Sequence, residues 1–255
     1  MKYAVLLLLL LFIICGCTEA PTALVDAETS AAETGSVETG SVGAESVESQ
    51  PKAKAKGPWG GLKVETRGAP LAESTQVVVL LHGYGTTNAD LVPFADRLAA
   101  EGRAFVFPAA PVELDSGGLA WATTQSEIET SSQSLQDLLA FVHETHPNSK
   151  ISVGGFSQGA SMSSLLVDSK TPLQHVVLFS PGLMLKDVQK TSGTGPAVYI
   201  SHGRQDKVLP FSDAQKLKDM LSNAGCEVKL SAFDGGHAIP ANVLSEAKAQ
   251  LDIGR

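Results

Sequence analysis

The chain has 255 residues, of which 43% are hydrophobic and 18% are charged, and its formal net charge at pH 7 is −8. An acidic chain of this kind lacks the basic surface that nucleic acids require, so we exclude nucleic-acid binding. Two of the cysteines, Cys15 and Cys17, lie near the N-terminus, and the third is Cys226. We therefore expect no intramolecular disulfide in the mature domain, and we expect Cys226 to be a buried, small hydrophobic residue.

The first residues have the pattern of an export signal. Met1 and Lys2 precede an apolar run at 3–14 that is too short to span a bilayer. This run ends in Ile-Cys-Gly-Cys at 14–17, which resembles the lipobox of bacterial lipoproteins. The resemblance implies that 1–16 are a removed signal peptide and that acylated Cys17 anchors the protein to a membrane. We expect an extracytoplasmic protein at the outer membrane or cell surface of a bacterium; the alternative is an ordinary signal peptide cleaved nearby.

The segment 17–57 has the composition of a tether. It consists mainly of Ala, Ser, Thr, Gly, Glu and Val, and Glu-Thr-Gly-Ser-Val occurs at 33–37 and again at 38–42. A segment with acidic residues and no aromatic residue buries too little apolar surface to offset its ordering entropy. We predict a disordered acidic tether here, followed by one globular domain at 58–255.

Strand and helix patterns alternate along that domain. We predict strands at 62–66, 76–81, 104–108, 150–155, 175–179, 197–202 and 227–233, and helices at 93–100, 126–144, 157–167, 211–223 and 240–251. Such alternation is typical of an α/β fold whose mostly parallel sheet is covered by helices on both faces. The irregular stretches 109–125 and 181–195 are candidate walls of a groove.

The fourth predicted strand leads into Gly-Phe-Ser-Gln-Gly at 155–159. A serine on a sharp strand-to-helix turn needs glycine two residues to either side, because side chains there would collide where helix crosses strand. The pattern predicts that Ser157 is a nucleophile, and the alternative is an ordinary strand-to-helix loop.

A serine nucleophile needs a base and an acid, which follow it in the chain in hydrolases of the α/β class. Of the later histidines, His175 opens an apolar strand, where structural hydrogen bonds are the expected role, and His202 precedes the best acid. His237 lies in a glycine-containing loop after the last strand, and we predict that it is the base. The predicted acid is Asp206, just beyond a strand end, with Asp234 as the rival.

Two backbone amides are predicted to form an oxyanion hole. The strand at 76–81 is followed directly by His-Gly-Tyr-Gly at 82–85. The hydrogen-bond donors should come from this loop and from the residue after the nucleophile. We expect the amides of Tyr84 and Gln158. A dinucleotide-binding fingerprint is the competing interpretation of the glycines, and it fails because Asn88 stands where the third glycine is required.

These motifs together resemble the phospholipase/carboxylesterase family of α/β-hydrolases, which includes acyl-protein thioesterases. The likeness is carried by the segments at 82–85, 155–159 and 202–206 and by Gly-His at 236–237. It implies an α/β-hydrolase fold, with Ser157, Asp206 and His237 as nucleophile, acid and base. The family usually has an aromatic residue and an aspartate after the groove tryptophan, but Ala-Thr follows Trp121 here.

A family-like groove would be walled by Trp121 with Leu119, and by Leu183 and Met184. The sequence therefore predicts a serine carboxylesterase that cleaves short- to medium-chain esters or thioesters through an acyl-enzyme, with no cofactor and no metal. Its expected partners are a small-molecule ester and, through the lipid, a membrane. Two alternatives stay open: a surface lipoprotein that keeps the fold as a non-catalytic binding module, and a peptidase or polyester depolymerase of the same fold.

Overall fold

The computed structural model describes residues 57–187 and 195–254, which belong to one compact unit. The expected signal peptide, Cys17 and the tether as far as residue 56 lie outside these residues. Residues 188–194 of the second irregular stretch lie outside them as well.

Seven strands of the described part form one sheet, in the order β1-β3-β2-β6-β7-β8-β9. Their bounds are Val64–Gly68 (β1), Gln76–Leu81 (β2), Arg103–Pro108 (β3), Lys150–Phe156 (β6), Leu173–Phe179 (β7), Ala197–Gly203 (β8) and Glu227–Phe233 (β9). β1 is antiparallel to β3, and the other neighbouring pairs are parallel. The carboxyl ends of the six parallel strands therefore share one edge of the sheet, where catalytic groups gather in open α/β sheets.

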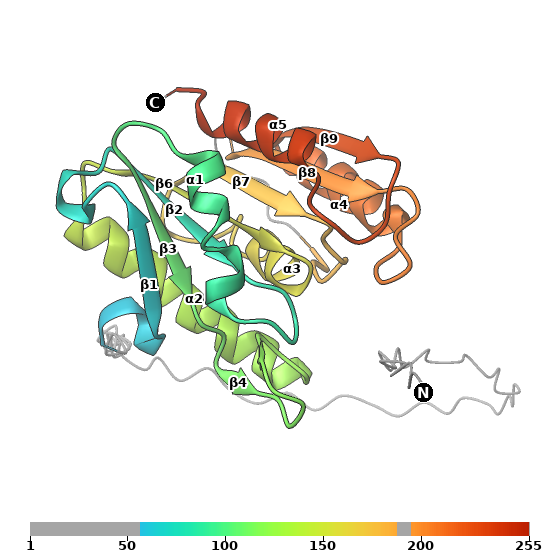
Figure 1. Cartoon of the computed structure of the whole chain (residues 1–255), viewed down its shortest axis with the longest axis horizontal. Coiled ribbons are helices and arrows are strands. Elements are labelled where there is room, and N and C mark those ends of the chain that lie inside the picture. The colour runs from blue at the N-terminus through green and yellow to red at the C-terminus, as the bar shows by residue number, and fades with distance from the viewer. Residues whose placement is uncertain (1–56, 188–194, 255) are drawn as a thin grey trace, which may run out of the picture. The chain divides into compact units, whose positions relative to one another are not determined.

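Helices cover both faces of this sheet (Figure 1). The helices are α1 (Phe94–Leu98), α2 (Gln125–Thr145), α3 (Gln158–Ser164), α4 (Phe211–Asn223) and α5 (Ala241–Leu251). Side chains of β2 alternate between two apolar clusters: Val77 and Val79 pack with α2, α3 and α4, whereas Val78 packs with α1 and α5. This arrangement confirms the predicted mostly parallel sheet with helices on both faces. No helix in the described residues is long and apolar enough to cross a membrane.

The predicted elements agree with the structure except at certain ends and in one irregular stretch. α1 is shorter than predicted, because the backbone at Ala99 is extended and the preceding Asn88–Leu91 forms a separate 3-10 helix, η3. The stretch 109–125 contains a small antiparallel hairpin of β4 (Val112–Glu113) and β5 (Leu119–Ala120). The structure also has 3-10 helices η1 (Pro58–Gly61) and η2 (Leu71–Glu73), which the sequence patterns did not predict.

Cys226 lies immediately before β9 as a free cysteine. Only 6% of its surface is exposed, and it packs in the cluster on the side of α4. Burial, with a smaller effect of the Asp168 charge, raises the pKa of the Cys226 thiol. The prediction of a buried, small hydrophobic cysteine is confirmed.

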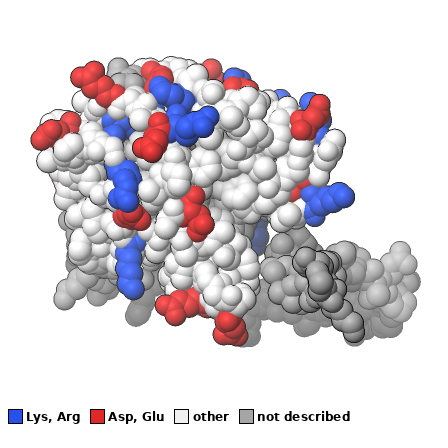
Figure 2. Space-filling model, viewed as in Figure 1, with Lys and Arg blue, Asp and Glu red and all other residues white. Residues whose placement is uncertain are grey.

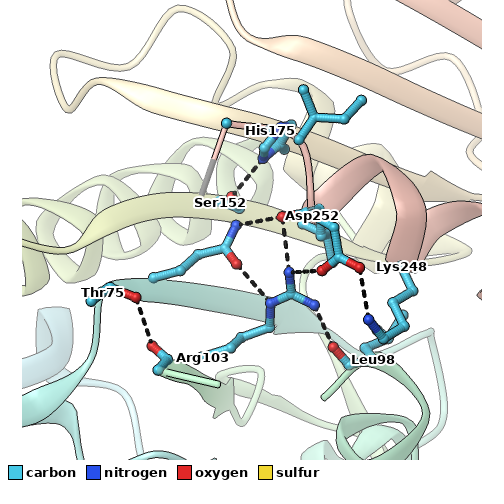
Figure 3. Close-up of polar contacts among 12 residues, drawn as sticks. Thr75, Leu98, Arg103, Ser152, His175, Lys248 and Asp252 are labelled. Carbon is cyan, nitrogen blue, oxygen red and sulfur yellow. Dashed lines mark hydrogen bonds and ion pairs between the residues drawn. The ribbon is translucent and has the colours of Figure 1, made fainter. Parts of the chain in front are cut away.

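A buried arginine joins the amino ends of the strands to the C-terminal helix (Figure 3). Arg103 opens β3 and is 1% exposed. Its guanidinium donates to the Gln76 side chain at 2.6 Å, to the Leu251 carbonyl at 2.8 Å and to the Asp252 carboxylate at 2.8 Å. It also donates to the Leu98 carbonyl. Charge-assisted bonds to several acceptors offset the cost of burying the cation, so the end of α5 is held firmly against the sheet.

His175 lies near this network, at the end of the sheet opposite the carboxyl ends of the strands. It is 2% exposed, and its Nδ1 atom lies 3.4 Å from the Ser152 hydroxyl, as Figure 3 shows. This agrees with the expected structural role of a strand histidine. Burial, followed by the charges of Arg103 and Lys150, lowers the pKa of His175 from 6.5 to about 4.

The lowered pKa of His175 predicts a pH-dependent stability. Between pH 6.5 and about 4, the unfolded chain binds a proton on this ring that the folded chain excludes. The stabilisation is complete above this window and is lost as the pH falls through it, and we expect about 2 kcal/mol less stability at pH 4.5 than at pH 7 from this group. Urea unfolding of His175→Gln at both pH values should show a weaker dependence of stability on pH than unfolding of the wild type. Equal pH slopes for His175→Gln and wild type would contradict this interpretation.

Candidate active site

Ser157 occupies a strained turn between β6 and α3. Its backbone angles are φ 55° and ψ −120°, a region that non-glycine residues rarely adopt. The amide of Ser157 donates to the Phe179 carbonyl at 2.9 Å, which fixes the turn against the neighbouring strand β7. Such strain costs of order 1–3 kcal/mol and typically persists at functional sites. The turn therefore has the geometry expected of a nucleophile elbow.

The two glycines of the elbow are required by close backbone contacts. A Cβ atom at Gly155 would lie 2.5 Å from the Leu81 carbonyl oxygen and 2.7 Å from the carbonyl carbon of Gly159. A Cβ atom at Gly159 would lie 2.1 Å from the same Leu81 oxygen. The helix and the adjacent strand β2 approach each other too closely for any side chain, which is the collision inferred from the sequence.

The structure brings two of the predicted catalytic residues, Asp206 and His237, into hydrogen-bonding contact. His237 Nδ1 lies 2.7 Å from Asp206 Oδ2. The loops that follow β8 and β9 place these side chains, because Arg204 N donates to Phe233 O at 2.9 Å and Gln205 N donates to Gly235 O at 3.0 Å. With Nδ1 donating to the carboxylate, the Nε2 atom of His237 is left with the lone pair that a general base needs.

The carboxylate of Asp206 is surrounded by donors. Its Oδ1 atom accepts hydrogen bonds from the amides of Val208 at 2.8 Å and Leu209 at 3.0 Å. Burial raises the pKa of Asp206, but these amide bonds and the contact with His237 outweigh it and hold the pKa below the ordinary value of 3.8. The group is therefore ionised at neutral pH, as an acid that orients a histidine must be.

A second histidine adjoins the same carboxylate. His202 Nε2 lies 3.0 Å from the Leu209 carbonyl and 3.3 Å from Asp206 Oδ2, and the side chain is fully buried. Because a carbonyl can only accept, Nε2 must carry the proton, so His202 cannot serve as a base through this atom. The structure places His202 behind the acid, in agreement with its exclusion as the general base.

Asp234, the rival candidate for the acid, has its ionic contact with Arg204 and not with His237. The side chain of Asp234 is 88% exposed, and its nearest ionic partner is Arg204, with Nε and Oδ1 4.0 Å apart. An exposed pair at this distance contributes little free energy. The geometry therefore favours Asp206 over Asp234 as the orienting carboxylate.

The predicted oxyanion loop lies beside the nucleophile. A Cβ atom at Gly83 would lie 3.4 Å from the Cβ atom of Ser157, so the residue before Tyr84 touches the elbow. Gln158 is the first residue of α3, where amides have no acceptor within the helix. The ring of His82 fixes the loop, because Ala110 N donates to its Nε2 at 3.1 Å and its Nδ1 lies 2.8 Å from the Gly83 carbonyl. Burial lowers the pKa of His82, which is therefore neutral at pH 7.

Trp121 is placed differently from its predicted position on a groove wall. Its side chain is fully buried, and the indole nitrogen donates to the His82 carbonyl at 2.9 Å. The amide of Trp121 donates to the Gln158 side-chain oxygen at 2.8 Å, and the Gln158 side-chain nitrogen donates to the Ala122 carbonyl at 2.6 Å. Trp121 thus packs against the predicted oxyanion loop, and Gln158 joins the segment at 121–122 to α3, the helix that follows Ser157. Sequence patterns did not indicate this second role of Gln158, because its partners lie far away in the chain.

The other predicted groove residues, Leu119, Leu183 and Met184, are partly buried. They pack against the apolar cluster that α2, α3 and α4 share with the sheet. Because most of the apolar surface of these three side chains is buried in this packing, little of it is left to form the wall of a groove.

A cavity adjoins His237, the predicted base, and none of the predicted groove residues lines it. Its volume is about 310 Å³. Its lining residues come from the loop after β2, η3, α1, the elbow and the His237 loop: Gly83, Thr86, Asp90, Leu91, Phe94, Phe156, His237, Ala238 and Ile239. No single sequence motif marks this set, because its members come from five separate segments of the chain.

Comparisons with known proteins agree with this architecture. Residues 68–254 match the model of the phospholipase/carboxylesterase family. The chain is 28% identical over 205 residues to acyl-protein thioesterase 1 of Eremothecium gossypii, covering 68% of this chain and 87% of the relative. Among solved structures, esterase PE8 is 26% identical with a TM-score of 0.65, covering 74% of this chain and 97% of that one. The Bacillus cereus carboxylesterase is 21% identical with a TM-score of 0.65, covering 75% of this chain and 93% of that one, and it shows the shared fold.

The family match spans most of the domain, from the last residue of β1 to the C-terminal turn after α5. With the parallel sheet, the covering helices and the esterase neighbours, it establishes an α/β-hydrolase fold. The chain therefore belongs to the phospholipase/carboxylesterase family of hydrolases.

Proposed function

We propose that this protein is a serine carboxylesterase that hydrolyses short- and medium-chain carboxylic esters and thioesters through an acyl-enzyme. The observation that carries the proposal is the 2.7 Å contact between His237 Nδ1 and Asp206 Oδ2 at the strand edge that also bears the strained Ser157. A buried carboxylate bonded to a histidine, together with a serine on a strained turn, is the combination that acyl transfer requires.

Each step of the reaction has a residue to perform it. Ser157 Oγ attacks the carbonyl carbon while His237 Nε2 accepts the hydroxyl proton, and Asp206 holds the ring and stabilises its positive charge. The amides of Gln158 and Tyr84 donate to the developing oxyanion. His237 then gives the proton to the departing oxygen or sulfur. Water, activated by the same histidine, attacks the acyl-enzyme and releases the acid and free Ser157.

Labelling with a fluorophosphonate tests this function against the non-catalytic alternative. A non-catalytic binding module needs no activated serine and should not react. The proposed enzyme should form a covalent adduct at Ser157, because His237 accepts the proton of the Ser157 hydroxyl. We expect one labelled peptide, containing Ser157, by mass spectrometry. An unlabelled, folded protein that binds esters without turnover would support the binding module.

The ester preference separates the proposal from the peptidase and depolymerase alternatives. The thioesterase and esterase relatives support esters as the substrate class. Assays with p-nitrophenyl esters, a matched p-nitroanilide and a polyester film would rank the three activities. Faster cleavage of the anilide or the film than of soluble esters would overturn the proposed substrate class.

We predict that kcat/KM is highest for short or medium acyl chains. Trp121 is fully buried, and Leu119, Leu183 and Met184 are largely committed to the core, so these residues can supply only a shallow acyl groove. Because each methylene that enters a pocket brings ~1–3 kcal/mol of discrimination, a short groove should give a clear optimum. The measurement is kcat/KM for p-nitrophenyl acetate through palmitate. An optimum at twelve carbons or beyond would overturn the prediction and indicate a lipase or depalmitoylase.

We also propose that Cys17 carries the lipid that anchors the enzyme outside the cytoplasm, where esters rather than cytosolic acylated proteins are its substrates. The support is the Ile-Cys-Gly-Cys pattern at 14–17, which lies outside the described residues. Two or three acyl chains give stable anchoring, whereas one chain is marginal.

The lipid anchor predicts two results in a bacterial host. Cys17→Ala should move the protein from the membrane fraction to the soluble fraction, because the acylated side chain is lost, whereas Cys15→Ala should stay with the membrane. Globomycin, an inhibitor of lipoprotein signal peptidase, should cause the unprocessed form to accumulate. An unmodified mature N-terminus at another position, found by mass spectrometry, would exclude the anchor.

A further inference from the structure

The cavity beside His237 is apolar over most of its wall and acidic at one point. Leu91, Phe94, Phe156 and Ile239 contribute apolar side chains, and Asp90 contributes a carboxylate. No lysine or arginine is among the described residues that line it. Figure 2 shows acidic and basic side chains over this face, including acidic side chains near its middle, with a wide uncharged area beside them.

The cavity lies on the histidine side of the nucleophile. His237 and the two residues after it form part of its wall, and the Phe156 ring packs on the His237 ring with centroids 4.7 Å apart. A base that has taken the serine proton must return it to the leaving oxygen, so the leaving group of a bound ester has to lie beside this imidazole. The position of the cavity is therefore that of the departing alcohol.

The predicted acyl groove lies on the other side of the sheet. Leu119, Leu183 and Met184 pack with the apolar cluster shared by α2, α3 and α4. Leu91, Phe94, Phe156 and Ile239 belong instead to the cluster shared by α1 and α5. The carbonyl carbon of an ester bears an acyl group on one side and an alkoxy group on the other. Residues packed on opposite faces of the sheet can therefore contact the two halves of the substrate separately.

We propose that this cavity binds the alcohol half of the substrate and selects neutral or cationic alcohols against anionic ones, with Asp90 as the discriminating residue. The inference rests on the proposed esterase function. A volume of about 310 Å³ is more than enough for an alcohol of a few carbon atoms.

Asp90 is placed and ionised by its neighbours. Its Oδ2 atom accepts hydrogen bonds from the Thr87 amide at 2.8 Å and the Thr87 hydroxyl at 2.9 Å, which close the capping box of η3. The amide bond, followed by the hydroxyl bond, lowers the pKa of Asp90, so it is a carboxylate at neutral pH. A fixed negative charge at the cavity repels an anionic alcohol and attracts a cationic one.

Three butyrate esters of similar shape test the role of charge: the 3,3-dimethylbutyl ester is neutral, the choline ester is cationic and the isethionate ester is anionic. The wild-type enzyme should have its lowest kcat/KM with the anionic ester. Asp90→Asn should raise the anionic-to-neutral ratio about five-fold and lower the cationic-to-neutral ratio. Asp90 is exposed, and this is the size expected for a unit charge about 4 Å away in a water-like dielectric. Asp96→Asn, an exposed α1 position outside the cavity lining, makes the same change in net charge and should leave both ratios unchanged.

A change in cavity size tests which half of the ester it holds. Phe94→Trp should narrow the cavity and lower kcat/KM for 3,3-dimethylbutyl butyrate about ten-fold relative to methyl butyrate. The acyl-length profile measured with methyl esters should not change. A shifted acyl profile, or unchanged ratios in both the charge and size series, would overturn the assignment. Absence of hydrolysis of every ester would instead overturn the esterase function itself, so the two failures can be told apart.

Discussion

Ser157→Ala should be folded and should hydrolyse esters at a rate close to background. The substitution removes the proposed nucleophile but leaves the strained turn, the Asp206–His237 contact and the proposed oxyanion amides in place. In a serine protease, where such residues act as a unit, loss of the nucleophile lowers kcat by about 10⁶. We therefore expect a loss of several orders of magnitude in kcat/KM and no fluorophosphonate adduct.

A second serine of the same helix provides the control. The hydroxyl of Ser163 is buried and donates to the Gly159 carbonyl at 2.8 Å, so it takes no part in the proposed reaction. Ser163→Ala should keep most of the activity, and circular dichroism should show both variants folded. Retention of more than a tenth of wild-type activity by Ser157→Ala would remove Ser157 from the nucleophile role.

Asp206→Asn should lower kcat/KM by about 10⁴. This is the loss in kcat found in a serine protease when the same change leaves the catalytic histidine in the wrong tautomer. The Asp206 side chain is fully buried and accepts from His237 Nδ1 at 2.7 Å. An asparagine that presents its amide nitrogen to the ring would favour the tautomer in which Nε2 carries the proton, and that tautomer cannot act as the base.

Asp234→Asn is the matched control for this prediction. It makes the same chemical change in the same pair of loops, but its side chain is 88% exposed and should affect kcat/KM by no more than a few-fold. Steady-state kinetics on one p-nitrophenyl ester would compare the two variants. The opposite ranking would give the acid role to Asp234.

The parts of the site that depend on local pattern could be predicted from the sequence. The elbow is a contiguous motif, and its glycines are required by contacts within one strand–helix crossing. Asp206 and His237 follow the ends of strands β8 and β9, and parallel pairing necessarily brings such ends to one edge of the sheet. The continuous apolar runs of the central strands made their ranges predictable almost to the residue.

Trp121 and the cavity could not be predicted in this way. Whether a tryptophan in an irregular stretch faces solvent or the core depends on how the β4–β5 hairpin packs, and strands of two residues leave no periodic signal. The hydrogen bonds of Gln158 to the segment at 121–122 depend on the same packing. The cavity combines residues of five separate segments, so its size and its carboxylate become visible only when the chain is folded.

The contacts of Arg103 at the opposite edge of the sheet bear on how His237 is held in place. α5 begins four residues after His237, and its far end is bound by the buried guanidinium through Leu251 and Asp252. The loop that carries His237 is thus fixed by β9 on one side and by a helix anchored at its last turn on the other. Proteolytic trimming or an engineered truncation that removes both Leu251 and Asp252 would take two acceptors, one of them a carboxylate, from a buried cation and free that helix end. Leu251 and Asp252 are therefore an integral part of the folded domain, and a purification tag fused after them is better tolerated when a spacer separates it from Asp252.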